Sequence, residues 1–366
     1  PTVAALWFCA EVTRKKEHDE RWVCVVAVAL LAAARTKGPV VPNLNTAFTF
    51  SFVESFDLPA DSRSTNGRTP LHVAACRGSL DCIGQLIALG ADIDARANDE
   101  GFALAGAAQF GHLGAVRLLI SLGADVQACY FTSGRNALHS AAENNRVSVI
   151  QYLVEECDMV VDAPDADGSI PLEIAASEGH LETLKLLVAL GADVFWCHPN
   201  HGWSALHAAA LSDHADVIRM LVREYHLPVD FRSKASSSVD LSGRTPLADA
   251  CSVGANKAVR VLVELGAELD EIEVILFGGK KVLTMLTIAV RAGHLSTTEL
   301  LIELGADTSK VDAAEASKGT SLLRRVREKT KSRPEAVEAA KAVKAAEAQR
   351  LAAEASKTAK AQRLAA

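Results

Sequence analysis

Residue types that could hold a metal gather at one place in this chain. Cys197, His198 and His201 lie within five residues, and His207 follows six residues later. Cysteine and histidine are the ligands that zinc prefers, and a structural zinc site needs four of them at converging positions. The spacing here matches none of the zinc-binding patterns. We therefore expect no metal site and no cofactor.

The other sequences that suggest chemistry are weaker. The run GGKK that begins at Gly278 suggests a phosphate-binding loop, but it lacks the first glycine and the following Ser or Thr of the motif GxxxxGK[ST]. No Ser/His/Asp or Cys/His set stands where a nucleophile and its base would meet. We therefore expect a protein that is not an enzyme.

The distribution of charge and the cysteine content indicate which compartment and which partners suit this protein. The chain of 366 residues has a net charge of −7, yet residues 324–366 carry twelve basic and five acidic side chains. The tail is therefore basic, and the rest of the chain is more acidic than the net charge of the whole chain indicates. The eight cysteines form no C-x-x-C pair, and the acceptor sequence N-x-S/T does not occur. These features favour a reducing, cytoplasmic location, with association with the cytoskeleton as one form of it.

A repeated unit organises the chain, and residues 66–95 show it in full as NGRTPLHVAACRGSLDCIGQLIALGADIDA. Pro70 presets the first turn of a helix, and the small Ala74 lets a neighbouring helix approach closely. Gly78 ends this helix in the left-handed conformation, and Gly90 ends a second apolar helix. Two such short helices cannot bury their apolar faces alone, so further copies must stack beside them.

The leucine of the TPLH tetrapeptide marks the register of the copies. Its steps along the chain are 33, 34, 34, 34, 41 and 39 residues. Seven copies of this sequence in register near 33 residues resemble the ankyrin repeat, over residues 63–308. The marker residues are Leu71, Leu104, Leu138, Leu172, Leu206, Leu247 and Leu286.

The resemblance implies an all-α ankyrin-repeat solenoid, in which helix-turn-helix repeats are joined by β-turn or hairpin fingers. It also implies that the threonine hydroxyl and histidine imidazole of TPLH fix the turn and bond neighbouring backbone. Histidines that follow a helix-ending glycine, at positions 112, 180 and 294, are structural in the same family. At the TPLH histidine position Glu173, Ala248 and Thr287 depart from the pattern. The residues that receive a structural role are Thr69, Pro70, Leu71, His72, His139 and His207.

Repeats three and five depart from the pattern at the ends of their helices. Asn145 and Asp213 replace the glycine that ends the first helix, and both residue types can adopt the left-handed conformation. Cys157 and Tyr225 stand where glycine usually ends the second helix. We therefore expect irregular exits from these two repeats.

Two insertions separate the last three repeats. Seven extra residues, rich in serine, precede repeat six, and five extra precede repeat seven. In the second insertion, residues 274–277 and 281–283 flank Gly278 and Gly279. These two segments on either side of two glycines predict an elongated hairpin finger with a Gly-Gly turn.

The segments outside the array have different compositions. We expect residues 1–62 to form a helical cap and an extended arm, residues 309–333 a basic linker, and residues 334–366 an Ala/Lys/Glu-rich helix. The apolar run at residues 22–34 has 13 residues, fewer than the roughly 20 that span a bilayer. A signal-peptide core is an alternative interpretation of that run.

We expect the chain to bind one or more proteins as a non-catalytic scaffold or adaptor within a larger assembly, a cytoskeletal one being a candidate. In the family that the repeats resemble, partners bind to the fingers and to the inner helix face, and aromatic residues are enriched at the centres of interfaces. Packing against adjacent fingers is the alternative role for the aromatic residues. The partner-binding candidates are Tyr130, Phe131, Phe195, Trp196, Trp203, Arg77, Phe110, Glu143, Asn144, Glu178, Leu211 and Arg291.

Two other classes of function remain as alternatives. One is a membrane-associated adaptor, anchored by residues 22–34. The other is a polyanion-binding protein that uses the basic tail, because lysine and arginine clusters attract phosphates. Nucleic acid is disfavoured because glutamates interrupt the basic face and no aromatic residues are interleaved with it.

Overall fold

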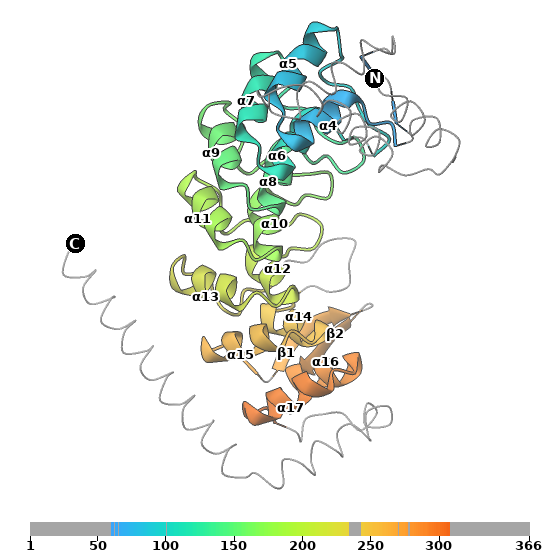
Figure 1. The fold of residues 1–366 in the computed structure, drawn as a ribbon. Coiled ribbons are helices and arrows are strands. Elements are labelled where there is room, and N and C mark those ends of the chain that lie inside the picture. The colour runs from blue at the N-terminus through green and yellow to red at the C-terminus, as the bar shows by residue number, and fades with distance from the viewer. Residues whose placement is uncertain are drawn as a thin grey trace, which may run out of the picture. The chain divides into compact units, whose positions relative to one another are not determined.

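The computed structural model describes residues 60–307, apart from residues 62, 65, 100, 234–242, 270 and 277–278. Of residues 271–276 and 279–282 it describes the backbone only. The expected N-terminal cap and arm, the basic linker and the C-terminal helix therefore lie outside the described residues. Within the described part, the chain forms fourteen α-helices and one two-stranded sheet (Figure 1). The expected all-α solenoid is confirmed for this part of the chain.

The chain divides into two units, one up to Pro171 and one from Leu172 onward, and each is described by itself. In the first unit the described residues form three helix pairs. They are α4 (Pro70–Arg77) with α5 (Leu80–Ala88), α6 (Ala103–Phe110) with α7 (Leu113–Ser121), and α8 (Ala137–Glu143) with α9 (Val147–Glu155).

The pairs of the first unit stack in two rows (Figure 1). The first helices α4, α6 and α8 pack against one another, and the second helices α5, α7 and α9 make the other row. Small side chains in the first row allow the close approach, because alanine adds little bulk between backbones. The buried alanines of this row include Ala74, Ala75, Ala107, Ala108, Ala141 and Ala142.

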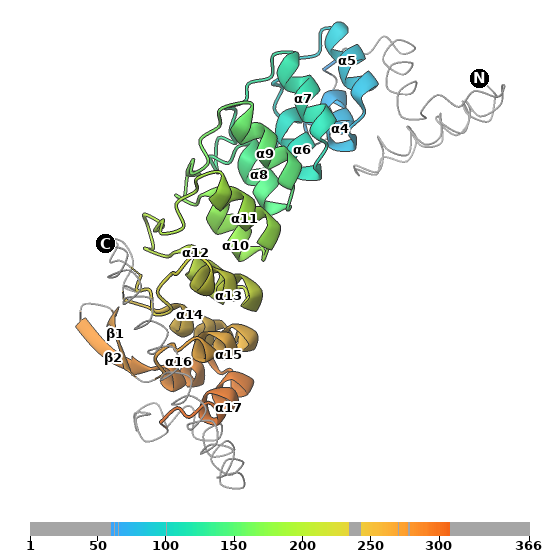
Figure 2. The same cartoon turned by 90° about the vertical axis from the view of Figure 1, so that its left-hand side faces the viewer.

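The second unit repeats this arrangement. Its helices are α10 (Pro171–Ser177), α11 (Leu181–Ala189), α12 (Ala205–Leu211), α13 (Ala215–Arg223), α14 (Pro246–Val253), α15 (Asn256–Glu264), α16 (Met285–Ala292) and α17 (Leu295–Glu303). The first helices α12, α14 and α16 pack in sequence, and so do the second helices α13, α15 and α17 (Figure 2). We call the second helices of the repeats the outer helices.

The strands β1 (Glu271–Leu276) and β2 (Gly279–Thr284) form the hairpin that the second insertion predicts. They are antiparallel, with Leu276 opposite Gly279. The expected Gly-Gly turn is wrong, because Gly279 already pairs in the ladder, and residues 277–278 lie outside the described residues. The hairpin leads directly into α16, whose N-cap is Thr284.

The marker leucines of all seven repeats are buried, with exposed fractions of 1% or less. Burying a leucine side chain contributes about 1.5–3 kcal/mol relative to leaving it exposed. The register that the sequence predicts is therefore confirmed. Apolar burial of this kind tolerates the loss of individual TPLH residues in the later repeats.

The left-handed residues at the helix ends agree with the sequence. Asn145 and Asp213 have φ angles of 57° and 61°, as expected where they replace glycine. At the second-helix exits of repeats three and five the left-handed residues are Asp158 and His226, one position after Cys157 and Tyr225, so the irregular exits that the sequence predicts are confirmed.

The reason for this shift is one extra residue in each exit. In repeat one the amide of Ala91 donates to the carbonyl of Leu86. At the equivalent place the amide of Met159 donates to the carbonyl of Leu153, and the amide of Leu227 donates to the carbonyl of Leu221. Each of these hydrogen bonds reaches six residues back, whereas the bond in repeat one reaches five. Both side chains are buried where regular repeats bury a small alanine. The larger apolar side chain anchors the longer exit.

Candidate functional site

The TPLH residues of repeat one form the turn network that the resemblance implies. The backbone amide of Thr69 donates to Nδ1 of His72 at 3.1 Å. The other ring nitrogen, Nε2, donates to the carbonyl of Gly101 in the next repeat at 2.9 Å. An accepting Nδ1 and a donating Nε2 define the neutral imidazole, so His72 is a structural group.

The same contacts recur at the two other histidines in this position. Nε2 of His139 donates to the carbonyl of Ser169 at 3.3 Å, and Nε2 of His207 donates to that of Arg244 at 3.2 Å. Burial lowers the pKa of His139 and lowers the pKa of His207 to about 4. These histidines are neutral at pH 7 and link one repeat to the next.

Repeats six and seven lack the histidine and keep the turn by another route. The hydroxyl of Thr245 accepts a hydrogen bond from the amide of Ala248 at 3.3 Å. In repeat seven the hydroxyl of Thr284 accepts from the amide of Thr287 at 3.1 Å. A side-chain oxygen at the N-cap satisfies one of the unpaired amides at the start of a helix. Local turn bonds thus persist where the histidine is missing.

Histidines that follow a helix-ending residue reach back to the preceding repeat. His112 Nε2 donates to the carbonyl of Cys76 at 3.0 Å, and His294 Nε2 donates to that of Ser252 at 3.1 Å. A structural role for these two histidines is confirmed. Arg146, at the same position in repeat three, donates from Nε to a backbone carbonyl in the same way.

The fingers of the first unit are joined by a ladder of aspartates. The carboxylate of Asp94 accepts from the amide of Asp125 at 3.1 Å, and that of Asp61 accepts from the amide of Asp92 at 3.0 Å. Corresponding residues are 33 positions apart. The periodic contacts therefore begin one finger before α4, and each finger is fixed to the next.

Adjacent aromatic residues in the finger before α8 have different surroundings. Tyr130 is half-buried, and its ring lies 5.4 Å from that of Phe102. Phe131 is 74% exposed, with the guanidinium of Arg96 over its ring at 4.1 Å. Arg96 is itself held by donating from Nη1 to the carbonyl of Cys129 at 2.6 Å. Phe131 is thus an exposed ring on a fixed support.

The sequence pattern did not lead us to Arg96 as the residue that supports the ring of Phe131. A signal was present, because Arg63 stands 33 residues before it and donates to the carbonyl of Arg96 as Arg96 donates to Cys129. An arginine that recurs at the repeat period on a finger indicates such a contact.

The finger before α12 holds the other three aromatic candidates. Phe195 is 52% exposed, whereas Trp196 and Trp203 are half-buried. The ring of His201 lies 4.9 Å from that of Trp203 and 4.8 Å from that of His198. Packing therefore accounts for Trp203 and the two histidines.

The possible zinc ligands of this finger do not form a metal site in the structure. Nδ1 of His198 accepts from the amide of Asn200 at 3.2 Å, and His207 makes the turn contacts given above. Across residues 60–307 with the gaps noted, no three His, Cys, Asp or Glu side chains converge as metal ligands would.

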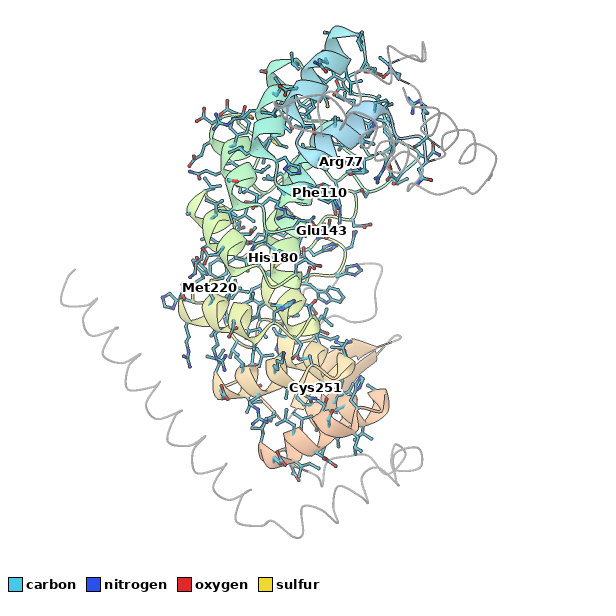
Figure 3. All side chains as sticks on the ribbon, viewed as in Figure 1. Arg77, Phe110, Glu143, His180, Met220 and Cys251 are labelled. Carbon is cyan, nitrogen blue, oxygen red and sulfur yellow. The ribbon has the colours of Figure 1, made fainter. Side chains whose placement is uncertain are left out.

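The inner-helix candidates of the first unit lie in a row at the ends of their helices. Figure 3 shows Arg77, Phe110 and Glu143 one above another at the ends of α4, α6 and α8. Phe110 is 50% exposed. Glu143 is paired with Arg135 at 3.1 Å, and the Asn144 amide donates to a backbone carbonyl of α8. The row presents a cation, an aromatic ring and a carboxylate.

The inner-helix candidates of the second unit differ from one another in exposure. Glu178 and Arg291 are exposed, and Leu211 is half-buried at the end of α12.

Comparison with known proteins identifies the fold family. A family model described as ankyrin repeats (3 copies) matches residues 31–129, 104–195 and 190–273. These matches cover more than half of the chain. The protein belongs to the ankyrin-repeat family. An ankyrin-repeat array is a protein–protein interaction module and is generally not enzymatic.

Curated relatives of this ankyrin-repeat protein match over parts of their length. The nuclear factor NF-kappa-B p105 subunit of Mus musculus is 37% identical over 133 residues, which is 36% of this chain and 10% of the relative. The probable E3 ubiquitin-protein ligase XBOS32 of Oryza sativa subsp. japonica is 30% identical over 176 residues, covering 47% and 32%. The Notch-regulated ankyrin repeat-containing protein of Xenopus laevis is 30% identical over 97 residues, covering 26% and 84%.

Among solved structures, the ankyrin repeat domain of human ASB11 superposes with a TM-score of 0.51 at 23% identity, covering 64% of this chain and 97% of that one. This likeness supports the fold alone. None of the helices that the structure describes has the length and apolar character needed to cross a membrane. The run at residues 22–34 lies outside the described residues.

Proposed function

We propose that this ankyrin-repeat protein is a non-catalytic scaffold or adaptor that holds a partner protein within a larger assembly. The observation that carries the proposal is Phe131, an aromatic ring 74% exposed at the tip of a finger. A ring of this size at a turn tip loses contact with water only when something covers it. Aromatic residues, phenylalanine among them, are enriched in protein interfaces relative to the rest of the surface.

The support beneath the ring favours binding. Arg96 stacks on Phe131 at 4.1 Å and is anchored to the carbonyl of Cys129. An anchored ring loses little conformational entropy when a partner covers it, so more of the burial energy appears as affinity. The proposed surface extends to the row of Arg77, Phe110 and Glu143, whose mixed character suits a protein partner.

The test is a comparison of variants in co-purification from the native source. Phe131→Ser removes the finger ring, and Phe110→Ser removes the ring of the inner row. The matched control is Leu122→Ser, which alters a side chain 40% exposed at the end of α7. We expect Phe131→Ser to weaken the affinity for a co-purifying protein by about thirtyfold, and so to reduce its recovery, because a central interface residue typically contributes about 2 kcal/mol or more.

The control should retain the partner, and circular dichroism should show unchanged helical content in all three variants. If Phe131→Ser and Phe110→Ser both retain the partner at the level of the control, the fingers and inner row do not form the binding surface.

A further inference from the structure

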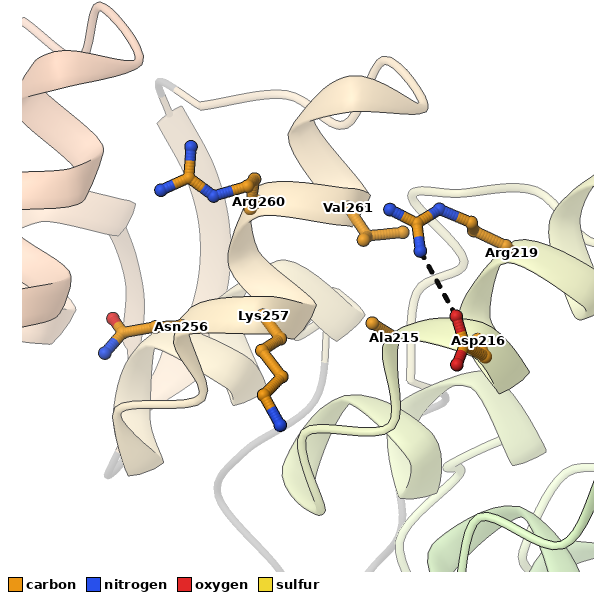
Figure 4. A pocket seen from close by; sticks show the side chains of 7 residues that line it. All are labelled: Ala215, Asp216, Arg219, Asn256, Lys257, Arg260 and Val261. Atoms are coloured by element: carbon orange, nitrogen blue, oxygen red, sulfur yellow. Dashed lines mark hydrogen bonds and ion pairs between the residues drawn. The ribbon is translucent and has the colours of Figure 1, made fainter.

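A groove on the outer helices of the second unit is lined by side chains that differ from those at the same positions of other outer helices. It lies between α13 and α15 and has a volume of about 470 Å³ with a mostly apolar wall. Figure 4 shows Ala215 and Val261 between Lys257 on one side and Arg219 with Asp216 on the other.

The groove exists because a large side chain is missing from the first position of α13. The first residue of the outer helix is Leu80, Leu113, Val147, Leu181 or Leu295 in five of the seven repeats. In α13 it is Ala215. An alanine leaves open the space that a leucine or valine would occupy, so the groove is a consequence of this one residue.

The contacts of the neighbouring helices show which space is left open. Leu80 lies over the second position of α7, since a Cβ atom added at Gly114 would be 3.5 Å from its side chain. Asn256, the first residue of α15, likewise reaches the second position of α17 and donates to the hydroxyl of Ser296 at 3.0 Å. The equivalent pair between α13 and α15 is Ala215 and Lys257. There the small side chain leaves Lys257 uncovered.

The rim of the groove carries unbalanced positive charge. Lys257 and Arg260 occupy the second and fifth positions of α15, and no other outer helix of the seven has a cation at both. Neither forms an ion pair with any residue in the described part of the chain. Arg219 is paired with Asp216 at 3.3 Å and with Glu264 at 3.4 Å, both weak surface contacts.

We propose that this groove binds an acidic segment of a partner protein, with one bulky aliphatic side chain seated over Ala215 and flanking Asp or Glu side chains facing Lys257 and Arg260. The apolar floor would exclude water from the aliphatic side chain, and the cations would fix the register of the carboxylates. The surface is separate from the fingers and the inner row, so the inference does not depend on them.

Charge complementarity selects a partner over the basic tail of this chain. Residues 324–366 carry twelve basic and five acidic side chains, so the groove repels that segment on average. An acidic segment instead gains from both rim cations, Lys257 and Arg260, although the chain outside the tail is acidic as a whole. We therefore assign the groove to a partner and treat the tail as a competitor to be tested.

The test uses the full chain and a fluorescein-labelled peptide in which one leucine is flanked on each side by Asp-Glu pairs. Fluorescence polarisation measures its affinity for the parent and for two variants. Ala215→Leu restores the leucine that other repeats have, so it fills the groove while preserving the fold. Lys257→Glu/Arg260→Glu reverses the rim charge. We expect each to weaken binding by about tenfold, because one filled pocket or two repulsive contacts remove that much affinity.

Two comparisons separate the groove from general charge attraction. Lys185→Glu, an exposed cation at the fifth position of α11, should change the affinity less than either groove variant. A second peptide carries alanine in place of leucine, and it should bind the parent more weakly than the leucine peptide does. The Ala215→Leu variant should bind the two peptides with equal affinity.

Equal affinity of the parent and Ala215→Leu for the leucine peptide would overturn the proposal, as would an absence of saturable binding by the parent. Binding that appears only after removal of residues 324–366 would mean that the tail occupies the groove, and it would overturn the assignment to a partner.

Discussion

Acid should weaken the second unit through His207, and the size of the effect follows from its burial. The ring is fully buried, its Nδ1 accepts from the amide of Ser204 at 3.2 Å, and Nε2 donates to the carbonyl of Arg244. Protonation of Nδ1 would remove its ability to accept that bond and would place a charge in the core.

The direction of the pH effect follows from the pKa of His207, which is about 4 in the folded protein and about 6.5 when the chain unfolds. The unfolded state therefore binds more protons between these values. Stability is fully present above pH 6.5 and is lost as the pH falls toward 4. At pH 5 the loss amounts to about 2 kcal/mol from this residue.

A variant that copies the turn of repeat six isolates this contribution. Ser204→Thr/His207→Ala reproduces the pair Thr245 and Ala248, in which the threonine hydroxyl accepts the bond from the helix. We expect the free energy of unfolding of the parent to fall by about 2 kcal/mol more between pH 7 and pH 5 than that of the variant. Urea unfolding followed by circular dichroism measures both.

One nearby group has the opposite pH dependence and cancels in this comparison. Burial raises the pKa of Asp249 to about 6, against the attraction of Arg244, whose Nε lies 2.6 Å from its carboxylate. Folding therefore takes up a proton at Asp249 between about pH 4 and 6, and its contribution to stability falls as the pH rises. Both proteins keep this pair. Identical pH dependence in parent and variant would refute the role given to His207.

Three further predictions concern a core leucine and two glycines of repeat one. Leu172→Ala, at a marker leucine 1% exposed, should lower the free energy of unfolding by about 2–5 kcal/mol in urea unfolding; an unchanged midpoint would mean that the register is wrong. Gly84→Ala should raise stability by about 0.5–1 kcal/mol, because it lies within α5 and an added Cβ would contact nothing within 4 Å. Gly78→Ala should instead lower it by about 1–2 kcal/mol, since Gly78 has φ of 67° and the new Cβ would lie 2.6 Å from the ring of His112; thermal melts of the two variants that shift in the same direction would contradict this reasoning.

The sequence predicted the repeat register, the helix ends and the hairpin, because these depend on local patterns. Leucine at the marker position and glycine at the helix ends recur at nearly constant spacing. Each has a local reason, namely burial for leucine and the left-handed conformation for glycine. The replacement of that glycine by Asn145 and Asp213 could be predicted for the same reason, since asparagine and aspartate tolerate positive φ.

Tertiary structure decided which candidate side chains are accessible to a partner. Tyr130 and Phe131 are neighbours of similar size, and nothing in their spacing distinguishes them. Only the position of Phe102, at the start of α6 in the preceding repeat, places one ring in contact and leaves the other exposed over Arg96.

The groove and the shifted helix exits also depend on contacts between repeats. Ala215 appears in the sequence as one more small residue, and its effect emerges only because the first residue of one outer helix covers the second residue of the next. Likewise, Cys157 occupies the position where glycine usually ends the helix, but the left-handed turn moves to Asp158 because burial of Met159 determines where the chain must turn. Local propensity fixed the elements, whereas the packing of one repeat on another fixed which side chains face solvent.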